Sequence, residues 1–138
     1  MSTYKAYEAI ASAWSAASLD TYITGGLWKD EAKPEVTWPY AVLTGIGNPA
    51  AMYDSDGQVR DHNFQISVFY KSNGSTSPGA AAGALIDRVI TAMEAATFSL
   101  GGSGTALYCR RTRDDVRQDE HQRDVWIGDA DFKMRRTQ

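Results

Sequence analysis

Cysteine and histidine are scarce in this chain of 138 residues. The single cysteine, Cys109, excludes an internal disulfide and fits a reducing compartment. The two histidines, His62 and His121, are the only side chains with an ordinary pKa near neutrality, and neither has a second histidine at ligand spacing. We therefore expect no metal site and no histidine-based catalysis, and we interpret both histidines as polar surface residues.

A dominant charge and long apolar runs are also absent. Lysine and arginine total 14 and aspartate and glutamate total 17, for a net charge of −3. This balance gives no general reason to bind nucleic acid or an anionic membrane. No stretch reaches the roughly 18 apolar residues of a membrane-spanning helix. The first residues lack the basic region and apolar run of a signal peptide, so none is predicted.

Motifs that carry chemistry are incomplete. The segment from Asp54 to Gly57 resembles the opening of a calcium loop, but glycine falls at position four and Gln65 occupies position twelve. We interpret it as a hairpin turn. The glycine-rich residues 101–104 lack the lysine and hydroxyl residue of a phosphate-binding loop. With no paired catalytic carboxylates, nucleophile motif or dinucleotide fingerprint, we predict that the chain is not an enzyme and needs no cofactor.

Hydrophobic and aromatic residues, by contrast, are plentiful. They include 4 Trp, 7 Tyr and 4 Phe, and 43% of the residues are hydrophobic. This composition argues against a disordered chain, and the length supports one core and hardly two. We therefore expect a single domain over residues 1–138.

Hydrophobic periodicity predicts an α+β fold. Apolar residues recur at helical spacing over residues 4–18 and 78–96, with Ser77 and Pro78 starting the second helix. Residues 38–44 and 59–71 read as strands, and a minor strand at Leu27 is left open. Residues 105–112 and 123–135 form a closing hairpin, connected by residues 113–122. The order α-β-β-α-β-β predicts a mostly antiparallel sheet of four to five strands with two helices on one face. Residues 45–57 and 72–79 are predicted to be loops that are mobile in the free protein.

The charged segment from Arg110 to Asp124, which includes this connection, is the candidate site. It mixes both charge signs so closely that they nearly cancel, which is unlike a nucleic-acid-binding hairpin. One interpretation is a solvated loop; the other is a charged contact surface in a homo-oligomer, where arginine pairs with a neighbour's carboxylates. The candidate interface residues are Arg110, Arg111, Arg113, Asp114, Asp115, Arg117, Asp119 and Glu120.

The chain resembles a known family. Its elements follow one another in the order found in tail-completion or tail-terminator proteins of long-tailed bacteriophages. They are the helix with Tyr4, Tyr7 and Ile10, the strand that begins Trp38-Pro39, the following strand with its Ser/Gly linker and alanine-rich helix, and the closing hairpin. The resemblance implies a homo-hexameric ring that caps the tail tube, stops its polymerisation and presents a surface to the head connector. It implies no cofactor, and it assigns no role to residues 45–57 or to the charged connection.

The expected partners are therefore further copies of the chain, the tail tube protein and the connector or neck proteins, with no membrane and no sequence-specific nucleic acid. The expected location is the virion tail, assembled in the host cytoplasm. Two alternatives stay open. One is a neck or head-closure protein of the same virion, and the other is a small-molecule-binding or enzymatic domain that uses a cleft between the helices and the sheet.

Overall fold

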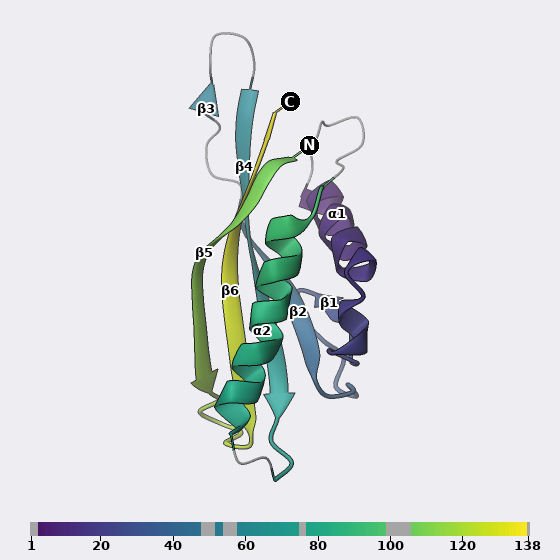
Figure 1. The fold of residues 1–138 in the computed structure, drawn as a ribbon, viewed down its shortest axis with the longest axis vertical. Helices are drawn as coiled ribbons and strands as arrows, with labels where there is room; N and C mark the ends of the chain where they lie inside the picture. Colours follow the sequence, from purple (N-terminus) through teal and green to yellow (C-terminus); the bar gives the residue numbers. More distant parts are fainter. Residues whose placement is uncertain (1–2, 48–51, 54–57, 75–76, 99–105, 138) are drawn as a thin grey trace.

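The computed structural model describes residues 3–47, 52–53, 58–74, 77–98 and 106–137. Within them the chain forms two α-helices, one 3-10 helix and six strands (Figure 1). In chain order these are α1 (Thr3–Ala16), η1 (Leu19–Thr21), β1 (Leu27–Lys29), β2 (Tyr40–Gly47), β3 (Met52–Tyr53), β4 (Gln58–Lys71), α2 (Pro78–Ala95), β5 (Ala106–Gln118) and β6 (Val125–Thr137).

The strands form one mixed sheet in the spatial order β1-β2-β4-β6-β5, and the short β3 pairs with β4. The β1–β2 pair is parallel and the other pairs are antiparallel. The central pair β4–β6 is long, running from Val59 opposite Thr137 to Lys71 opposite Val125. The predicted α+β fold with a mostly antiparallel sheet is confirmed, including the minor strand at Leu27.

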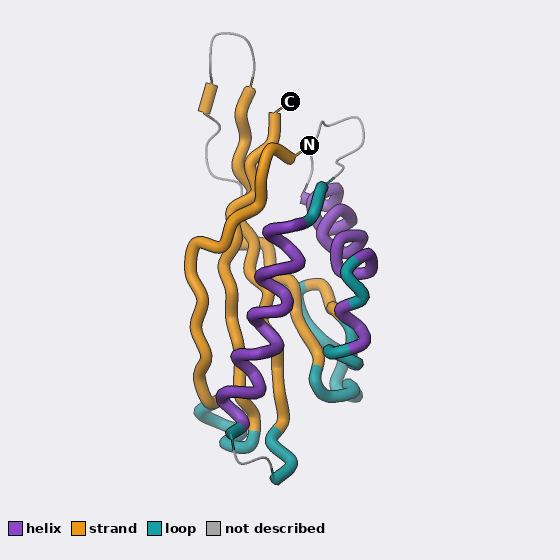
Figure 2. The backbone as a smooth tube through the Cα atoms, in the orientation of Figure 1, coloured by secondary structure: helices purple, strands orange, loops and turns teal. Residues whose placement is uncertain are grey.

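Both helices lie on one face of this sheet (Figures 1 and 2). Strand alternation explains why, because Phe64, Ile66 and Val68 of β4 point to the same face and are at most 3% exposed. The β6 residues opposite them, Phe132 and Ala130, join the same core. From the helices, the core receives Ala9, Ile10, Ala13 and Trp14 of α1 and Ile86, Val89, Ile90 and Met93 of α2.

A glycine in β6 sets the distance between α2 and the sheet. Gly128 lies beneath the helix, and a Cβ atom built on it would be 3.0 Å from the Ile86 Cβ and 3.1 Å from the Ala82 carbonyl oxygen. Both distances are tighter than ordinary contacts, so a side chain at this position would force the helix outward. At the start of α2, Ser77 occupies the N-cap position and Pro78 the first turn, as predicted.

The prediction that His62 is a surface residue is wrong. His62 is 5% exposed. It lies two residues before Phe64 and opposite Met134, so strand alternation turns it toward the buried face of the sheet. His121, in contrast, is exposed as predicted.

The prediction of one long loop over residues 45–57 is also wrong. The β2 ladder continues past a bulge between Gly45 and Gly47, and Met52 and Tyr53 pair with Val59 and Gln58. The strands on either side of residues 54–57 therefore pair as a hairpin does. Those four residues, like 48–51 and 75–76, lie outside the described part of the chain, and loop mobility stays a prediction.

Candidate interaction surface

The charged segment belongs mainly to a strand, not to a connection. We predicted a strand that ends at Thr112 and a connection over residues 113–122, but β5 continues to Gln118 and pairs with β6 along its length. The turn is correspondingly short, and it is closed by a hydrogen bond from the Asp119 N–H to the Val125 carbonyl oxygen at 2.9 Å. Cross-strand ion pairs explain how a strand can contain so many arginines and aspartates.

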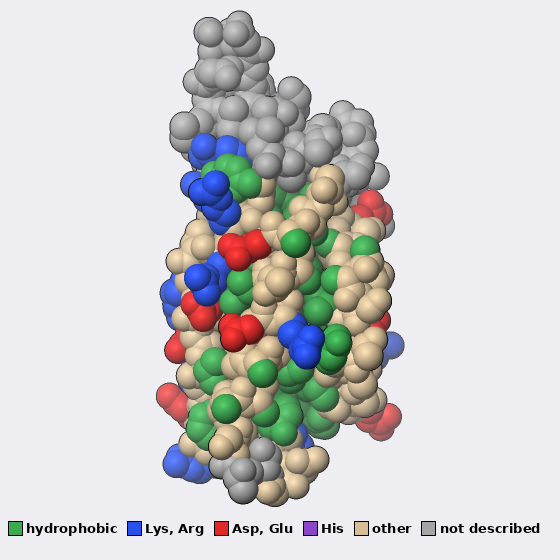
Figure 3. Space-filling view, in the orientation of Figure 1, with side chains coloured by type: hydrophobic (Ala, Val, Ile, Leu, Met, Phe, Trp, Pro, Cys, Tyr) green, Lys and Arg blue, Asp and Glu red, His purple; other side chains and the backbone are tan. Residues whose placement is uncertain are grey.

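The structure brings six of the eight candidate residues together on this strand at the edge of the sheet. Figure 3 shows basic and acidic side chains interspersed along the β5 side of the molecule. The strand residues are Arg110, Arg111, Arg113, Asp114, Asp115 and Arg117, all exposed, while Asp119 and Glu120 lie in the turn. The face on which each strand residue lies follows from its register with β6.

On the helix-free face, Arg117 belongs to a partly buried polar network. Its guanidinium donates a hydrogen bond to Asp129 Oδ2, and the Ser67 hydroxyl donates to Asp129 Oδ1 at 2.6 Å. The Asp129 side chain is 7% exposed, whereas that of Arg117 is 50% exposed. The hydrogen bond to Asp129 raises the pKa of Arg117 further, so the arginine is permanently charged. It thereby neutralises a carboxylate that the sheet removes from water.

A second, more exposed network lies beside it. Arg113 Nη1 is 3.9 Å from an Asp131 carboxylate oxygen, and Gln65 donates to the other oxygen at 2.8 Å. On the helix side, Arg111 pairs with Asp114 at 3.5 Å, and its backbone N–H donates to the Glu94 carboxylate of α2 at 3.1 Å. Most arginines of β5 thus already have an acidic partner within the chain.

The turn residue Asp119 organises the end of the hairpin. Its carboxylate accepts hydrogen bonds from the backbone N–H groups of His121 at 2.8 Å and Gln122 at 3.2 Å. These bonds favour the charged form and lower the pKa of Asp119. Its role within the subunit is therefore to fix the turn.

The partners Asp129, Asp131, Ser67 and Glu94 were missed by sequence reasoning. The signal for two of them was present, because Asp129 and Asp131 alternate with the predicted core residues of the last strand. The missing information was the register between the strands, which decides which arginine lies opposite which carboxylate.

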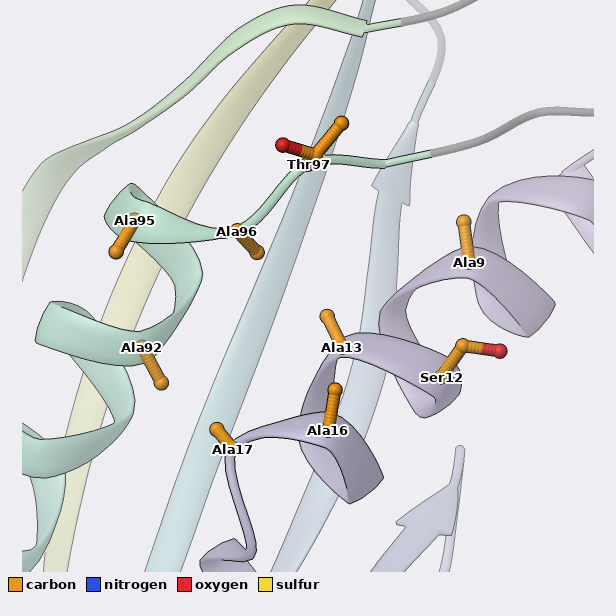
Figure 4. A pocket seen from close by; sticks show the side chains of 9 residues that line it. All are labelled: Ala9, Ser12, Ala13, Ala16, Ala17, Ala92, Ala95, Ala96 and Thr97. Atoms are coloured by element: carbon orange, nitrogen blue, oxygen red, sulfur yellow. The ribbon is translucent and has the colours of Figure 1, made fainter.

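Hollows also lie elsewhere on the described surface. One, of about 460 Å³, lies between α1 and α2, and Figure 4 shows that alanine side chains such as Ala13 and Ala92 line it. Another, of about 530 Å³, lies on the helix-free face, and Pro34, Trp38, Tyr40 and Phe69 are among the residues that line it. The first is a hollow between the helices, but its lining supplies only the hydroxyls of Ser12 and Thr97 as polar side-chain groups. It offers no acid–base pair for the enzymatic alternative.

Cys109 is buried in β5, where it is 4% exposed. Burial raises the pKa of its thiol to about 12, with a smaller contribution from Glu94. We expect the folded protein to react with a thiol reagent at neutral pH far more slowly than the urea-unfolded chain, because the thiolate is the reactive form. Absorbance after addition of an aromatic disulfide reagent measures both rates. Equal rates would contradict the burial of this side chain.

Other kinds of site find no support in the described residues. Among them, no group of three His, Cys, Asp or Glu side chains is arranged to hold a metal ion. No described helix is long and apolar enough to cross a membrane.

Comparison with known proteins identifies the family. Residues 8–135 match the family described as tail completion protein gp17. No curated protein matches the sequence. Solved structures do share the fold: a chain titled "Virion of native gene transfer agent (GTA) particle" superposes with a TM-score of 0.67 and 23% identity, over 95% of this chain and 93% of that one. Because the family match spans almost the whole sequence, the chain belongs to the tail completion protein gp17 family.

Proposed function

We propose that the protein forms a homo-hexameric ring that caps the tail tube of a phage-like virion, ends tube polymerisation and presents the surface on which the head joins. The observation that carries this proposal is the family match over residues 8–135, which gives the chain a structural role in a virion tail. The structural neighbour, a chain of a gene transfer agent virion, has the same fold over nearly its full length. Assembly would take place in the host cytoplasm.

The mechanism of capping is geometric. A ring that docks on the last ring of the tube covers the surface where the next tube subunit would add, and its other side meets the connector or neck proteins. Each contact can be weak, because a symmetric ring engages a symmetric tube through several copies at once. No chemical step is required.

The charged strand β5 and its turn are the proposed contact surface in this assembly. They lie at the edge of the sheet, and they carry both charge signs in nearly equal number, which suits a contact between two different faces of neighbouring subunits. The pairs inside the chain, such as Arg113 with Asp131, hold several of these side chains in place before any partner arrives.

A charge reversal tests this surface. We expect the triple change Arg110→Glu, Arg111→Glu and Arg113→Glu to leave the subunit folded but to abolish ring assembly or tail capping. A single exposed pair contributes only about 0–1 kcal/mol, but several reversals repeated around a ring add up and introduce repulsion. Electron microscopy of the purified protein with and without tail tubes gives the result.

The matched control reverses three exposed cations elsewhere, Lys29→Glu, Lys33→Glu and Arg88→Glu, and has the same change in net charge. The control should still form rings that cap tubes. If the β5 variant caps tubes as well as the control does, β5 is not the contact surface. Rings that bind connectors but never tubes would instead assign the protein to the neck.

A further inference from the structure

The strand β5 leaves a row of backbone groups without a partner in the described sheet. Within the described residues it is the last strand of the sheet, and its one strand neighbour is β6 (Figure 1). The backbone N–H of Asp119 donates to the carbonyl oxygen of Val125. In an antiparallel pair, every second residue forms such hydrogen bonds with the neighbouring strand, so the backbone groups of Arg117 and Asp115 also point toward β6. The N–H and C=O groups of the alternate residues, Asp114, Val116 and Gln118, therefore point away from β6, to the outer edge of the sheet.

The two halves of this edge differ. The first half is protected, because bulges interrupt it between Ala106 and Tyr108 and between Arg111 and Arg113, and Glu94 accepts the Arg111 N–H. The second half, residues 113–118, pairs with β6 in unbroken register and contains no lysine or proline. Its protection consists of charged side chains of both signs, which repel a strand of like charge but attract one of complementary charge. In its middle lies Val116, a large hydrophobic side chain that is 37% exposed.

When two copies of residues 113–118 run antiparallel, acidic side chains of one copy can lie opposite basic side chains of the other. We propose that β5 pairs antiparallel with β5 of a second copy of the chain, around a two-fold axis at Val116. In this register Val116 lies opposite the partner's Val116, and Asp115 lies opposite the partner's Arg117 in both directions. Asp114 lies opposite the partner's Gln118, which can donate an amide hydrogen bond to a carboxylate.

Other two-fold registers are less favourable. An axis at Asp114 places that carboxylate opposite its own copy and Arg111 opposite the partner's Arg117. An axis at Asp115 likewise sets two carboxylates against each other and Arg113 against the partner's Arg117. Like charges directly opposite destabilise a strand pair, so the charge order selects the register centred on Val116. That register also places the outward-pointing backbone groups of Asp114, Val116 and Gln118 against the same groups of the partner.

The pairing forms a two-fold dimer of the free protein, and a two-fold contact does not by itself close a ring of six. The proposed function also places the ring contact on β5. If both contacts use this strand, the dimer must separate before the ring assembles. The pairing itself stands independently of that function. A short edge contact of this kind buries little surface, so we expect a reversible, concentration-dependent dimer.

Cysteine cross-linking tests the register. Residues opposite each other in a hydrogen-bonded antiparallel pair have Cα atoms about 5.5 Å apart, within disulfide range. Mild oxidation of Val116→Cys should therefore yield a covalent dimer. Asp114→Cys alone should not, because its two copies would lie more than about 13 Å apart, whereas a mixture of Asp114→Cys and Gln118→Cys should. The buried Cys109 serves as the native background.

Solution measurements test the pairing without cysteines. Sedimentation of the wild type should show a monomer–dimer equilibrium, and Asp115→Arg should weaken it at least about tenfold by setting arginine against arginine. Asp87→Arg on α2 makes the same charge change away from the edge and should leave it unchanged. Val116→Pro should abolish the dimer while keeping the β6 ladder, because only an outward N–H is lost.

A wild type that remains monomeric at all concentrations overturns the proposal. So does a dimer that Asp115→Arg and Val116→Pro leave intact, or cross-linking at Asp114→Cys alone but not at Val116→Cys. A protein that forms rings on tubes and yet never pairs through Val116 would uphold the proposed function and reject this contact.

Discussion

Gly128→Val is expected to destabilise the protein by about 3 kcal/mol, at the upper end of the usual effect of overpacking a core. Gly128 is buried in β6 directly under α2, and even a methyl group there would be 3.0 Å from the Ile86 Cβ and 3.1 Å from the Ala82 carbonyl oxygen. Neither obstacle can swing away, because one is part of the helix backbone and the other is attached to it. The branched side chain must therefore lift α2 from the sheet.

Two variants make this expectation specific. Gly83→Ala adds a methyl group inside α2 where the nearest heavy atom, Val116 Cγ2, is 3.7 Å away, so the change should stabilise the protein by up to about 1 kcal/mol through helix propensity. Ile86→Ala combined with Gly128→Val should cost less than the sum of the two single changes, because the valine methyl groups can occupy the space that the truncated Ile86 side chain, with its Cγ2 at 3.2 Å, leaves empty. Urea unfolding followed by circular dichroism measures all three. A Gly128→Val variant within about 0.5 kcal/mol of wild type would show that α2 packs less closely than the structure has it.

The elements that the sequence could predict are those whose signal is local. Alternation of Phe64, Ile66 and Val68 identifies a half-buried strand without any knowledge of its neighbours. Ser77 and Pro78 likewise mark the start of a helix. The closing hairpin was predicted from the same kind of pattern.

The errors lie where a partner distant in the sequence decides the outcome. Arg113 and Asp115 belong to a strand because β6 supplies hydrogen bonds and, in Asp131, an opposite charge. Nothing within residues 113–118 themselves favours a strand over a loop. His62 is similar, because its polar neighbours in the sequence suggest a surface position while its place in the ladder turns it toward Met134.

For the candidate site, the sequence therefore predicted which residues to consider, but not how their side chains pair in three dimensions. Six of its members share one strand, and their role as a contact surface stays a prediction. Their pairing inside the subunit depends on a register that composition does not encode, so the carboxylates of Asp129 and Asp131 were not assigned to it. The self-complementary order around Val116 became visible only once the segment was known to be an edge strand.

Arg117→Met is expected to destabilise the protein by about 2 kcal/mol, because the buried Asp129 carboxylate loses its cationic partner. The Asp129 side chain is 7% exposed. In the variant it keeps the hydrogen bond from the Ser67 hydroxyl but loses the one from the guanidinium. Removing one partner of a fully buried pair costs about 3–5 kcal/mol, and the value here is lower because Arg117 is itself 50% exposed and its departure admits water.

The double variant Arg117→Met with Asp129→Asn separates this cause from lost packing. Once the aspartate is neutral, loss of the arginine should cost little, so the two changes should be strongly non-additive in urea unfolding. Arg113→Met provides the matched control, because its partner Asp131 is more exposed and lies 3.9 Å away, and its cost should stay below about 1 kcal/mol. Additive costs for Arg117 and Asp129, or equal costs for Arg117→Met and Arg113→Met, would mean that the buried carboxylate does not depend on Arg117.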